Sequence, residues 1–174
     1  MFKVIILAII FSLCTGFAQN QNEQNNQEET ADSTINKSQP DDQSVVKSIL
    51  DQCGLSDASI EDVAEIENGR VVSLDLSNND FTKDGIDKIP SEISKLTALQ
   101  KLTCNNNVIS EIPDEIGSLT ELKQLILQSN RITDISPEIG KCVKIEDLDL
   151  RHNQLSHIPD EMGSLKELRR LWLW

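Results

Sequence analysis

The residues that could carry out chemistry are few in this chain, and their spacing forms no catalytic or metal-binding set. His152 and His157 are five residues apart, with no carboxylate-rich ligand set around them, which disfavours a zinc site. Removal of an amino-terminal leader would leave Cys53, Cys104 and Cys142, an odd number that argues against a disulfide framework. The sequence has neither a glycine-rich phosphate loop nor a nucleophile motif. It therefore predicts no metal, no cofactor and no enzymatic activity.

Residues 80–85 (DFTKDG) imitate the start of a calcium-binding loop. The eighth loop position is Asp87 rather than an apolar residue, and the twelfth is Ser91 rather than Glu. An insertion within a repeated unit, described below, explains this segment better. Paired acidic residues elsewhere are interpreted as solvated charge on outer turns, for example Asp114 with Glu115 and Asp160 with Glu161.

Composition limits the classes of partner. The chain has 174 residues, and 29 Asp and Glu against 16 Lys and Arg give it a net charge of −13. Phosphates and anionic lipids would repel such a chain, which argues against nucleic-acid and membrane-surface partners. Aromatic residues make up 3% of the chain and none is Tyr. The core must therefore consist of Leu and Ile, which disfavours a deep pocket lined by aromatic side chains.

Residues 1–18 have the layout of a cleavable signal peptide. Their apolar run, residues 4–13, is too short for a membrane span of about 20 residues. Small residues then precede a cut between Ala18 and Gln19. An alternative makes Cys14 the lipidated residue of a bacterial lipoprotein and attaches the protein to a membrane, although the leucine before it fits poorly. Both interpretations predict a secreted, periplasmic or cell-surface protein.

The stretch that follows is predicted to be a linker. Residues 19–44 begin with a Gln/Asn-rich tract and continue with Glu, Asp, Ser and Thr, and Ile35 is their only large apolar residue. Such a composition cannot offset the entropy of ordering a chain. We therefore expect disorder over this range.

From Val71 onward the sequence repeats with a period of 23 residues. Three kinds of residue recur in step: Leu102, Leu125, Leu148 and Leu171; Asn107, Asn130 and Asn153; Gly117, Gly140 and Gly163. An earlier copy is five residues longer, and its insertion lies between Phe81 and Ile89. Residues 71–174 thus contain four full units and the strand of a fifth.

The shared pattern, LxxLxLxxNxLxxIPxxIGxL, resembles the leucine-rich repeat of the 23-residue kind, and with the leader it resembles secreted, bacterial members of that family. Departures are mild: Cys104 and Cys142 replace Leu, and Pro137 is displaced by one position. The resemblance implies an α/β fold, namely a leucine-rich-repeat solenoid that forms a short curved arc with a parallel sheet on its concave face.

Physical chemistry accounts for the pattern independently of the resemblance. Alternate residues of a strand point to opposite sides, so both leucines of each Leu-x-Leu, from Leu74/Leu76 to Leu171/Leu173, are expected to point inward. Each repeated Asn carries a donor and an acceptor. We expect it to satisfy backbone groups of its own coil and of the next one.

Residues 45–70 are predicted to cap the first repeat. Val46, Ile49, Leu50 and Cys53 have helical spacing, and Gly54 follows as a stop signal. Segments 60–66 and 71–76 flank Asn68-Gly69, the strongest short signal for a hairpin turn. A helix and a β-hairpin should therefore cover the open edge.

The resemblance also implies where a partner would bind. Residues between the inward leucines would face the concave side, and ten of them form the candidate binding surface: Asp75, Lys101, Thr103, Gln124, Ile126, Asp147, Asp149, Arg151, Arg170 and Trp172. Trp and Arg often dominate the energetics of interfaces. The expected partner is a protein, with a glycan as the alternative.

Other functions remain open from the sequence. The chain stops within the strand Leu171–Trp174 without a polar cap, so it can be a fragment, or it can self-associate through this open edge. As a fragment it would be a structural or adhesive module, or the recognition part of an enzyme, within a longer cell-surface protein. The preferred hypothesis is an exported, non-enzymatic binding module.

Overall fold

The computed structural model describes residues 41–78 and 85–174. All of them lie within residues 37–174, one of the two units into which the chain divides. The predicted signal peptide with its cut between Ala18 and Gln19, the alternative lipidation site Cys14 and nearly all of the predicted linker lie outside the described residues. So do residues 80–84 of the calcium-like segment.

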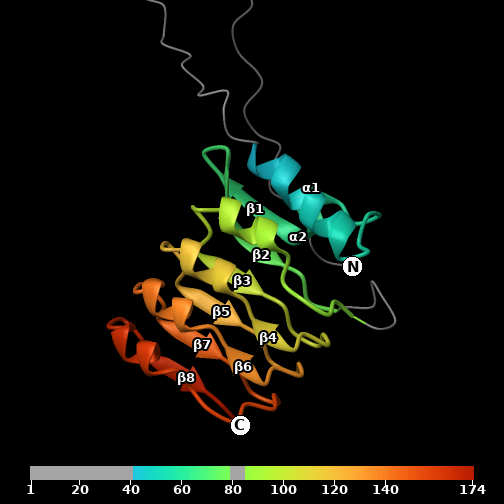
Figure 1. The fold of residues 1–174 in the computed structure, drawn as a ribbon. Helices are drawn as coiled ribbons and strands as arrows, with labels where there is room; N and C mark the ends of the chain where they lie inside the picture. Colours follow the sequence, from blue (N-terminus) through green and yellow to red (C-terminus); the bar gives the residue numbers. More distant parts are fainter. Residues whose placement is uncertain (1–40, 79–84) are drawn as a thin grey trace, which may run out of the picture. The chain divides into compact units, whose positions relative to one another are not determined.

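Successive coils of the described chain each add one strand to a six-stranded sheet with the order β1-β2-β3-β5-β7-β8 (Figure 1). A second, two-stranded sheet pairs β4 with β6. The bounds of the helices, 3₁₀ helices (η) and strands are α1 Asp42–Gln52, α2 Ile60–Val63, β1 Ala64–Glu67, β2 Arg70–Asp75, η1 Ser91–Lys95, β3 Lys101–Thr103, β4 Glu111–Ile112, η2 Asp114–Ser118, β5 Gln124–Ile126, β6 Asp134–Ile135, η3 Pro137–Lys141, β7 Asp147–Asp149, η4 Asp160–Ser164 and β8 Arg170–Trp172.

Strands β2 to β8 of the large sheet run parallel, in the register that the repeat predicts. Leu74 lies opposite Leu102, and Leu102 lies opposite Leu125, 23 residues later. The same alignment continues through Leu148 to Leu171. Because parallel strands need long crossovers, each coil returns through a 3₁₀ helix. The predicted solenoid with a parallel sheet is confirmed.

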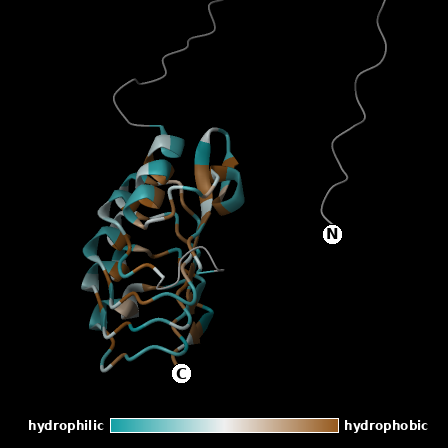
Figure 2. Cartoon of the chain, turned by 90° about the vertical axis from the view of Figure 1, so that its right-hand side faces the viewer, coloured by the Kyte–Doolittle hydropathy of each residue, from teal (hydrophilic) through white to brown (hydrophobic). Residues whose placement is uncertain are grey.

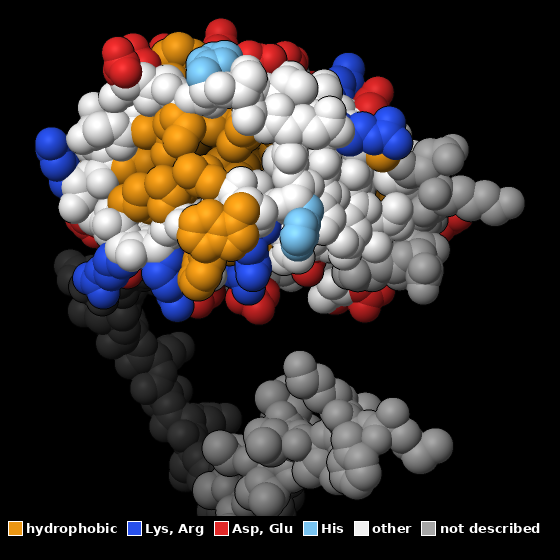
Figure 3. Space-filling model, turned by 90° about the horizontal axis from the view of Figure 1, so that it is seen from below, with side chains coloured by type: hydrophobic (Ala, Val, Ile, Leu, Met, Phe, Trp, Pro, Cys, Tyr) orange, Lys and Arg blue, Asp and Glu red, His pale blue; other side chains and the backbone are white. Residues whose placement is uncertain are grey.

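The core consists of stacked layers of Leu and Ile, and apolar and polar stretches alternate along the coils (Figure 2). The first four inward pairs are at most 2% exposed: Leu74/Leu76, Leu102/Cys104, Leu125/Leu127 and Leu148/Leu150. The fifth pair, Leu171 and Leu173, is only partly buried, which corrects the expectation for this coil. Among the described residues no further coil packs on these leucines, and hydrophobic side chains gather at this end of the molecule (Figure 3).

A ladder of asparagine side chains runs along one turn of the coils. Asn130 Nδ2 donates to the carbonyls of Cys104 at 2.9 Å and Leu127 at 3.0 Å, and its Oδ1 accepts from the Ile109 amide at 3.1 Å. Asn107 and Asn153 make equivalent hydrogen bonds. The predicted ladder is present, but each Asn bonds its own coil and the preceding one rather than the next.

Helix α1 begins earlier than the sequence predicts. The Asp41 side chain accepts a hydrogen bond from the Gln43 amide and caps the helix, so residues 42–44 belong to α1 and not to the linker. Asp42, 6% exposed, accepts from the Arg70 guanidinium at 2.9 Å and from the Val71 amide at 2.8 Å. This carboxylate therefore ties the helix to β2.

The carboxyl end of α1 follows the predicted stop signal. Gly54 has a φ of +72°, a left-handed conformation that glycine adopts without strain. Its amide donates to the Asp51 carbonyl, and the Leu55 amide donates to that of Leu50. Together these hydrogen bonds form a Schellman motif.

The hairpin forms at Asn68-Gly69, where both φ angles are positive, at 50° and 76°, as a type I′ turn requires. Its second strand, β2, is also the first strand of the parallel sheet. Residues 60–63, expected in the first hairpin strand, instead form α2. Glu61 and Asp62 lie in the first turn of α2, where the helix dipole favours negative charge.

The repeated glycines allow neighbouring 3₁₀ helices to pack closely. A Cβ atom added to Gly140 would lie 2.8 Å from the Glu161 carbonyl oxygen, and one added to Gly117 would lie 2.9 Å from that of Glu138. Gly163, in the last coil, has no atom within 4 Å of such a Cβ. The glycines are thus needed wherever another coil stacks on the helix.

We expect Asn130→Ala to lower the free energy of unfolding by about 3 kcal/mol, because it leaves a buried amide and buried carbonyls unpaired. Asn153→Ala should cost less, since Asn153 is more exposed and water can replace its hydrogen bonds. Urea denaturation of both variants measures this difference. Equal losses would contradict the role assigned to burial.

We expect Gly140→Ala to destabilise the protein by about 1–3 kcal/mol, because the added methyl group forces two coils apart. Gly163→Ala is the matched control, with the same substitution at the same repeat position, and should change stability by less than about 0.5 kcal/mol. Thermal or urea denaturation distinguishes the two. A loss at Gly163 as large as that at Gly140 would contradict close coil packing as the cause.

Candidate binding face

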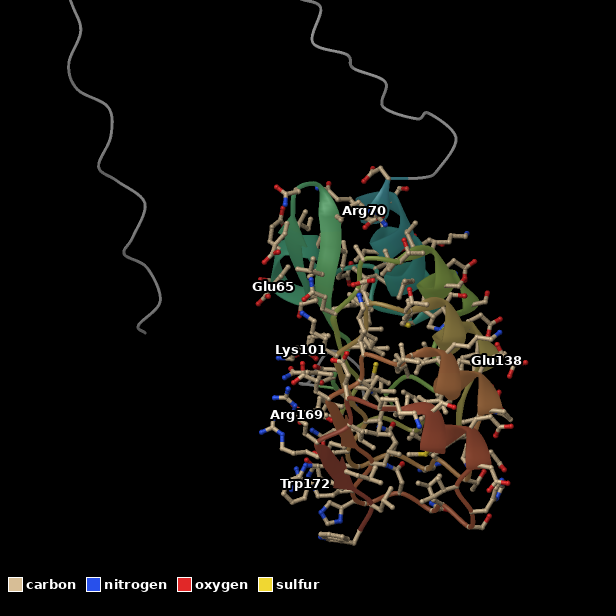
Figure 4. The ribbon with its side chains drawn as sticks, turned by 90° about the vertical axis from the view of Figure 1, so that its left-hand side faces the viewer. Glu65, Arg70, Lys101, Glu138, Arg169 and Trp172 are labelled. Carbon is tan, nitrogen blue, oxygen red and sulfur yellow. The ribbon has the colours of Figure 1, made fainter. Side chains whose placement is uncertain are left out.

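The register of the large sheet places nine of the ten predicted site residues in two columns across its strands. One column runs Ser73, Lys101, Gln124, Asp147 and Arg170, and the other runs Asp75, Thr103, Ile126, Asp149 and Trp172. We call the outward side of this sheet, together with Arg151, the sheet face. Lys101, Arg169 and Trp172 project on this side, whereas Glu138 of η3 lies on the opposite side (Figure 4).

Asp147 on β7 lies at the centre of a set of contacts between three strands. It accepts hydrogen bonds from Arg170 Nε and Nη2 on β8, and from Gln124 Nε2 on β5 at 3.2 Å. The bond from Arg170 holds the pKa of the Asp147 carboxyl below its ordinary value. Asp147 itself is buried, but the Arg170 side chain stays 62% exposed.

Asp149, two residues further along β7, holds a second arginine. Arg151 Nε lies 3.0 Å from Asp149 Oδ1, and its Nη2 lies 2.6 Å from Oδ2. Burial raises the pKa of the Asp149 carboxyl, but the hydrogen bonds from Arg151 outweigh burial, and the pKa falls below its ordinary value.

The Arg151 guanidinium is fixed by further contacts. Its Nη2 also donates to Gln128 Oε1 at 3.3 Å. Its carbon Cζ lies 5.3 Å from the ring centroid of Trp172, within the range of a cation–π interaction. Trp172 in turn meets Trp174 edge to face, with 6.3 Å between ring centroids. Arg151, Trp172 and Trp174 thus form one preorganised cluster, which we call the Arg–Trp cluster.

The opposite end of the sheet face, beside the β1–β2 hairpin, is acidic. A hollow of about 200 Å³ there is lined by four carboxylates and by Lys101; the carboxylates are those of Glu61, Asp62, Glu65 and Asp75. Lys101 also lines a neighbouring hollow of about 270 Å³ with Lys123 and Glu146. The sheet face is therefore negative at its hairpin end and carries exposed arginines at β8.

The ten predicted residues differ in exposure. Four are exposed (Asp75, Lys101, Arg170 and Trp172), three are half-buried (Gln124, Ile126 and Arg151), and three are buried (Thr103, Asp147 and Asp149). The buried three can contribute only through the side chains that cover them. For the two aspartates, those side chains are the arginines.

Sequence reasoning missed three charged residues beside these columns. Lys123 donates to Gln100 Oε1 at 3.0 Å, and Arg169 lies 3.5 Å from Glu146. Both occupy the repeat position just before the strand, so the 23-residue spacing could have identified them. Glu65 lies opposite Ser73 only through the hairpin register, which no repeat signal encodes.

The His, Cys, Asp and Glu side chains were also candidates for a metal site. Among them, no three or more His, Cys, Asp and Glu residues group so as to hold a metal ion. His152 has a φ of +55°, the turn conformation that Asn106 and Ser129 adopt in earlier coils. His157 Nε2 lies 3.8 Å from Asp134 Oδ1, and both side chains are exposed.

The three cysteines among the described residues are free thiols, and burial raises the pKa of both Cys53 and Cys142 to about 11. The carboxylate of Asp87 contributes to the shift at Cys53. Burial also raises the pKa of the Cys104 thiol. Protonated thiols are poor nucleophiles, so these side chains act as small apolar core residues. Within residues 41–78 and 85–174, no helix has the length and apolar character to cross a membrane.

The two arginine-bound aspartates should make stability depend on pH. Because their folded pKa values are lowered, the stabilisation is present above the unfolded pKa of about 3.9 and is lost as the pH falls through the folded values. We expect the free energy of unfolding to decline as the pH falls below about 5. Urea denaturation at several pH values measures this decline.

Asp147→Asn with Asp149→Asn should make that decline shallower, and Arg151→Gln with Arg170→Gln should do the same by removing the donors. A decline as steep as that of the wild type in both double variants would contradict the assigned cause.

Comparison with known proteins places the chain in a family. The model for a leucine-rich repeat region matches residues 50–174, which is most of the chain. A search of curated proteins finds no significant match.

Solved structures with the same fold come from plants and bacteria. A plant ice-binding protein is 26% identical with a TM-score of 0.66, over 76% of this chain and 47% of that one. A leucine-rich-repeat protein of Leptospira interrogans is 26% identical with a TM-score of 0.53, over 65% of this chain and 35% of that one. A chain of the BIR3–SERK2 complex of Arabidopsis thaliana is 29% identical with a TM-score of 0.52, over 64% of this chain and 59% of that one.

The chain thus spans less than two thirds of the length of these neighbours. The family model nevertheless covers the solenoid from the end of α1 to β8, and the stacked coils, the parallel sheet and the asparagine ladder follow its repeat. This chain belongs to the leucine-rich-repeat family.

Proposed function

We propose that this chain is an exported, non-enzymatic module that binds a protein partner through its sheet face. The observation that carries the proposal is the Arg–Trp cluster. Arg151 is held by Asp149 and Gln128, stacks on Trp172, and remains 37% exposed at its side chain. Arg and Trp are among the residues that most often dominate binding energy.

Preorganisation makes such a cluster effective. Ordering a long side chain on binding costs about 0.5–1.5 kcal/mol, and here the Arg151 side chain is already ordered by its contacts within the protein. The strands beneath it are fixed in register by the repeat. A partner would therefore meet a rigid surface, and little of the binding energy would be lost in ordering it.

A protein partner fits this face better than the alternatives. One structural neighbour is a complex of two proteins, whereas another is an ice-binding protein. Ice is a periodic lattice, and a face that matches it must repeat its side chains. The central column here, from Asp75 and Thr103 to Asp149 and Trp172, does not repeat. A glycan is supported only by the aromatic side chains, so we place it second.

The exported location is part of the proposal and rests on residues 1–18. Their short apolar run, followed by small residues before Gln19, has the layout of a cleavable signal. Lipidation at Cys14 is the variant of this proposal that would keep the protein on a membrane surface.

Site-specific photo-crosslinking tests the proposed function. A benzophenone amino acid is placed at Lys101, which is exposed on the sheet face, or at Lys141, which is 62% exposed on η3. The full chain is then irradiated in extract of the cell that naturally makes it. We expect a defined protein adduct from position 101 and none from position 141.

Lys141 is the matched control because it is an exposed lysine on the opposite side of the same coils. Adducts from position 141 alone, or the same adducts from both positions, would contradict binding through the sheet face. An adduct that contains carbohydrate instead of protein would replace the protein partner with a glycan.

A further inference from the structure

The exposed arginines on and beside β7 and β8 are unusual for this molecule. The chain carries a net charge of −13, yet the side chains of Arg151, Arg169 and Arg170 are 37%, 74% and 62% exposed at one end of the sheet face. The aspartates that pair with Arg151 and Arg170 lie beneath them and are 6% and 7% exposed. At these two ion pairs a partner therefore meets the guanidinium groups rather than the carboxylates, whereas Glu146, which pairs with Arg169, is 33% exposed at its side chain.

Arg151 and Arg170 each keep hydrogen-bond donors that the described residues do not use. Arg151 uses Nε and Nη2 for Asp149 and Gln128, and Arg170 uses Nε and Nη2 for Asp147. Among the described residues neither Nη1 group takes part in a hydrogen bond. A guanidinium has five N–H donors in a fixed fork, so each arginine still presents donors suited to a carboxylate.

The spacing of the two arginines favours one arrangement of carboxylates. They are anchored on Asp147 and Asp149, which are two residues apart on β7 and point to the same side. Two residues of a strand span roughly 6.6 Å. Alternate residues of an extended peptide have the same separation and also share one side. Carboxylates at positions i and i+2 of a bound segment would thus match the two guanidinium groups.

The rest of the sheet face determines where such a segment can lie. Glu61, Asp62, Glu65 and Asp75 surround the hollow at the hairpin end and would repel an acidic segment. At the other end, Trp172 is 39% exposed and Trp174 is 75% exposed, which offers apolar contact next to the arginines. Charge and apolar surface therefore both place the segment over β7 and β8.

We propose that the sheet face binds an extended acidic segment of a protein, with carboxylates at alternate positions on Arg151 and Arg170 and an apolar side chain against Trp172. This inference rests on the proposed function and specifies the chemistry of the partner. It differs from attraction by net charge, because the protein as a whole is acidic and its net charge repels an acidic segment.

Synthetic peptides test the proposal directly. The probe is the blocked peptide LSESESL, in which both glutamates and both leucines lie on one side of an extended chain. LSSEESL has the same composition but adjacent glutamates, and LSKSKSL reverses the charge. Binding is followed by tryptophan fluorescence, which reports only on this site because Trp172 and Trp174 are the two tryptophans of the chain and it has no Tyr.

We expect LSESESL to bind at least about tenfold more tightly than LSSEESL, and LSKSKSL to give no change in fluorescence. Affinity should fall as salt is raised, because exposed charges are screened. Equal affinity for LSESESL and LSSEESL would overturn the proposal, and so would tighter binding of trigalacturonate, an acidic glycan.

A charge-neutral double variant tests the role of the arginine. Asp149→Asn with Arg151→Gln removes one guanidinium group and leaves the net charge unchanged, so loss of LSESESL binding cannot come from a change in overall charge. Glu138→Gln with Lys141→Gln is the matched control, since it removes an ion pair on η3 and should leave binding intact. Circular dichroism confirms that both variants fold.

If the first double variant does not fold, Arg170→Gln replaces it, because Arg170 lies on an exposed edge strand; we again expect about a tenfold loss. Unchanged binding in the folded variant would overturn the proposal. Crosslinks to a protein from position 101 without selective binding of LSESESL would leave the proposed function standing and overturn only the acidic segment.

Discussion

Every coil of this protein must pair the backbone groups buried at its turns, and the asparagine ladder meets that requirement. A buried peptide group without a partner costs about 1–3 kcal/mol, and each turn buries several. Asn107, Asn130 and Asn153 each bond backbone atoms of two successive coils. The ladder therefore joins the coils as well as completing them, and it requires one asparagine in every repeat at a constant spacing.

Constant coil length sets the register of the sheet, and the register produces the binding face. Asp147 and Arg170 are 23 residues apart in the sequence but adjacent in the sheet, as are Gln124 and Asp147. A slip of one residue would turn the side chains of a strand to the other side of the sheet, burying these charges and exposing leucines. The same periodic constraint that stabilises the core thus also assembles the ion pairs of the sheet face.

Periodic features of this fold could be predicted from the sequence, because repetition reveals them without knowledge of distant contacts. The inward leucines, the asparagine ladder and the two columns from Ser73 and Asp75 belong to this class. Features at the ends could not be predicted in the same way. Asp42 is buried because Arg70 and the Val71 amide, 28 and 29 residues away, bind it, and no local pattern encodes that contact.

In the candidate site, too, the repeat predicts which residues lie on the sheet face but not which side chains cover them. Sequence reasoning identified Asp147, Asp149, Arg151, Arg170 and Trp172 from their place in the repeat. It placed the aspartates on the concave side, and the structure adds that their side chains are nearly covered. Their depth depends on the side chains above them, since Arg170 comes from the next strand and Arg151 folds back from the loop after β7. Burial of a polar side chain is a property of its neighbours, and the repeat alone does not specify it.

Placing aspartates beneath arginines has a consequence for recognition. Each ion pair is close to neutral, so the cluster adds little long-range field to a molecule that is acidic overall. The remaining N–H groups of the arginines are directional hydrogen-bond donors. They point from fixed positions because the carboxylates below hold the guanidinium planes in place. Attraction would then depend on the geometry of a partner's carboxylates more than on their number. Such a surface can distinguish two acidic residues at alternate positions from the same two residues at adjacent positions, which a flexible lysine cluster of the same charge could not do.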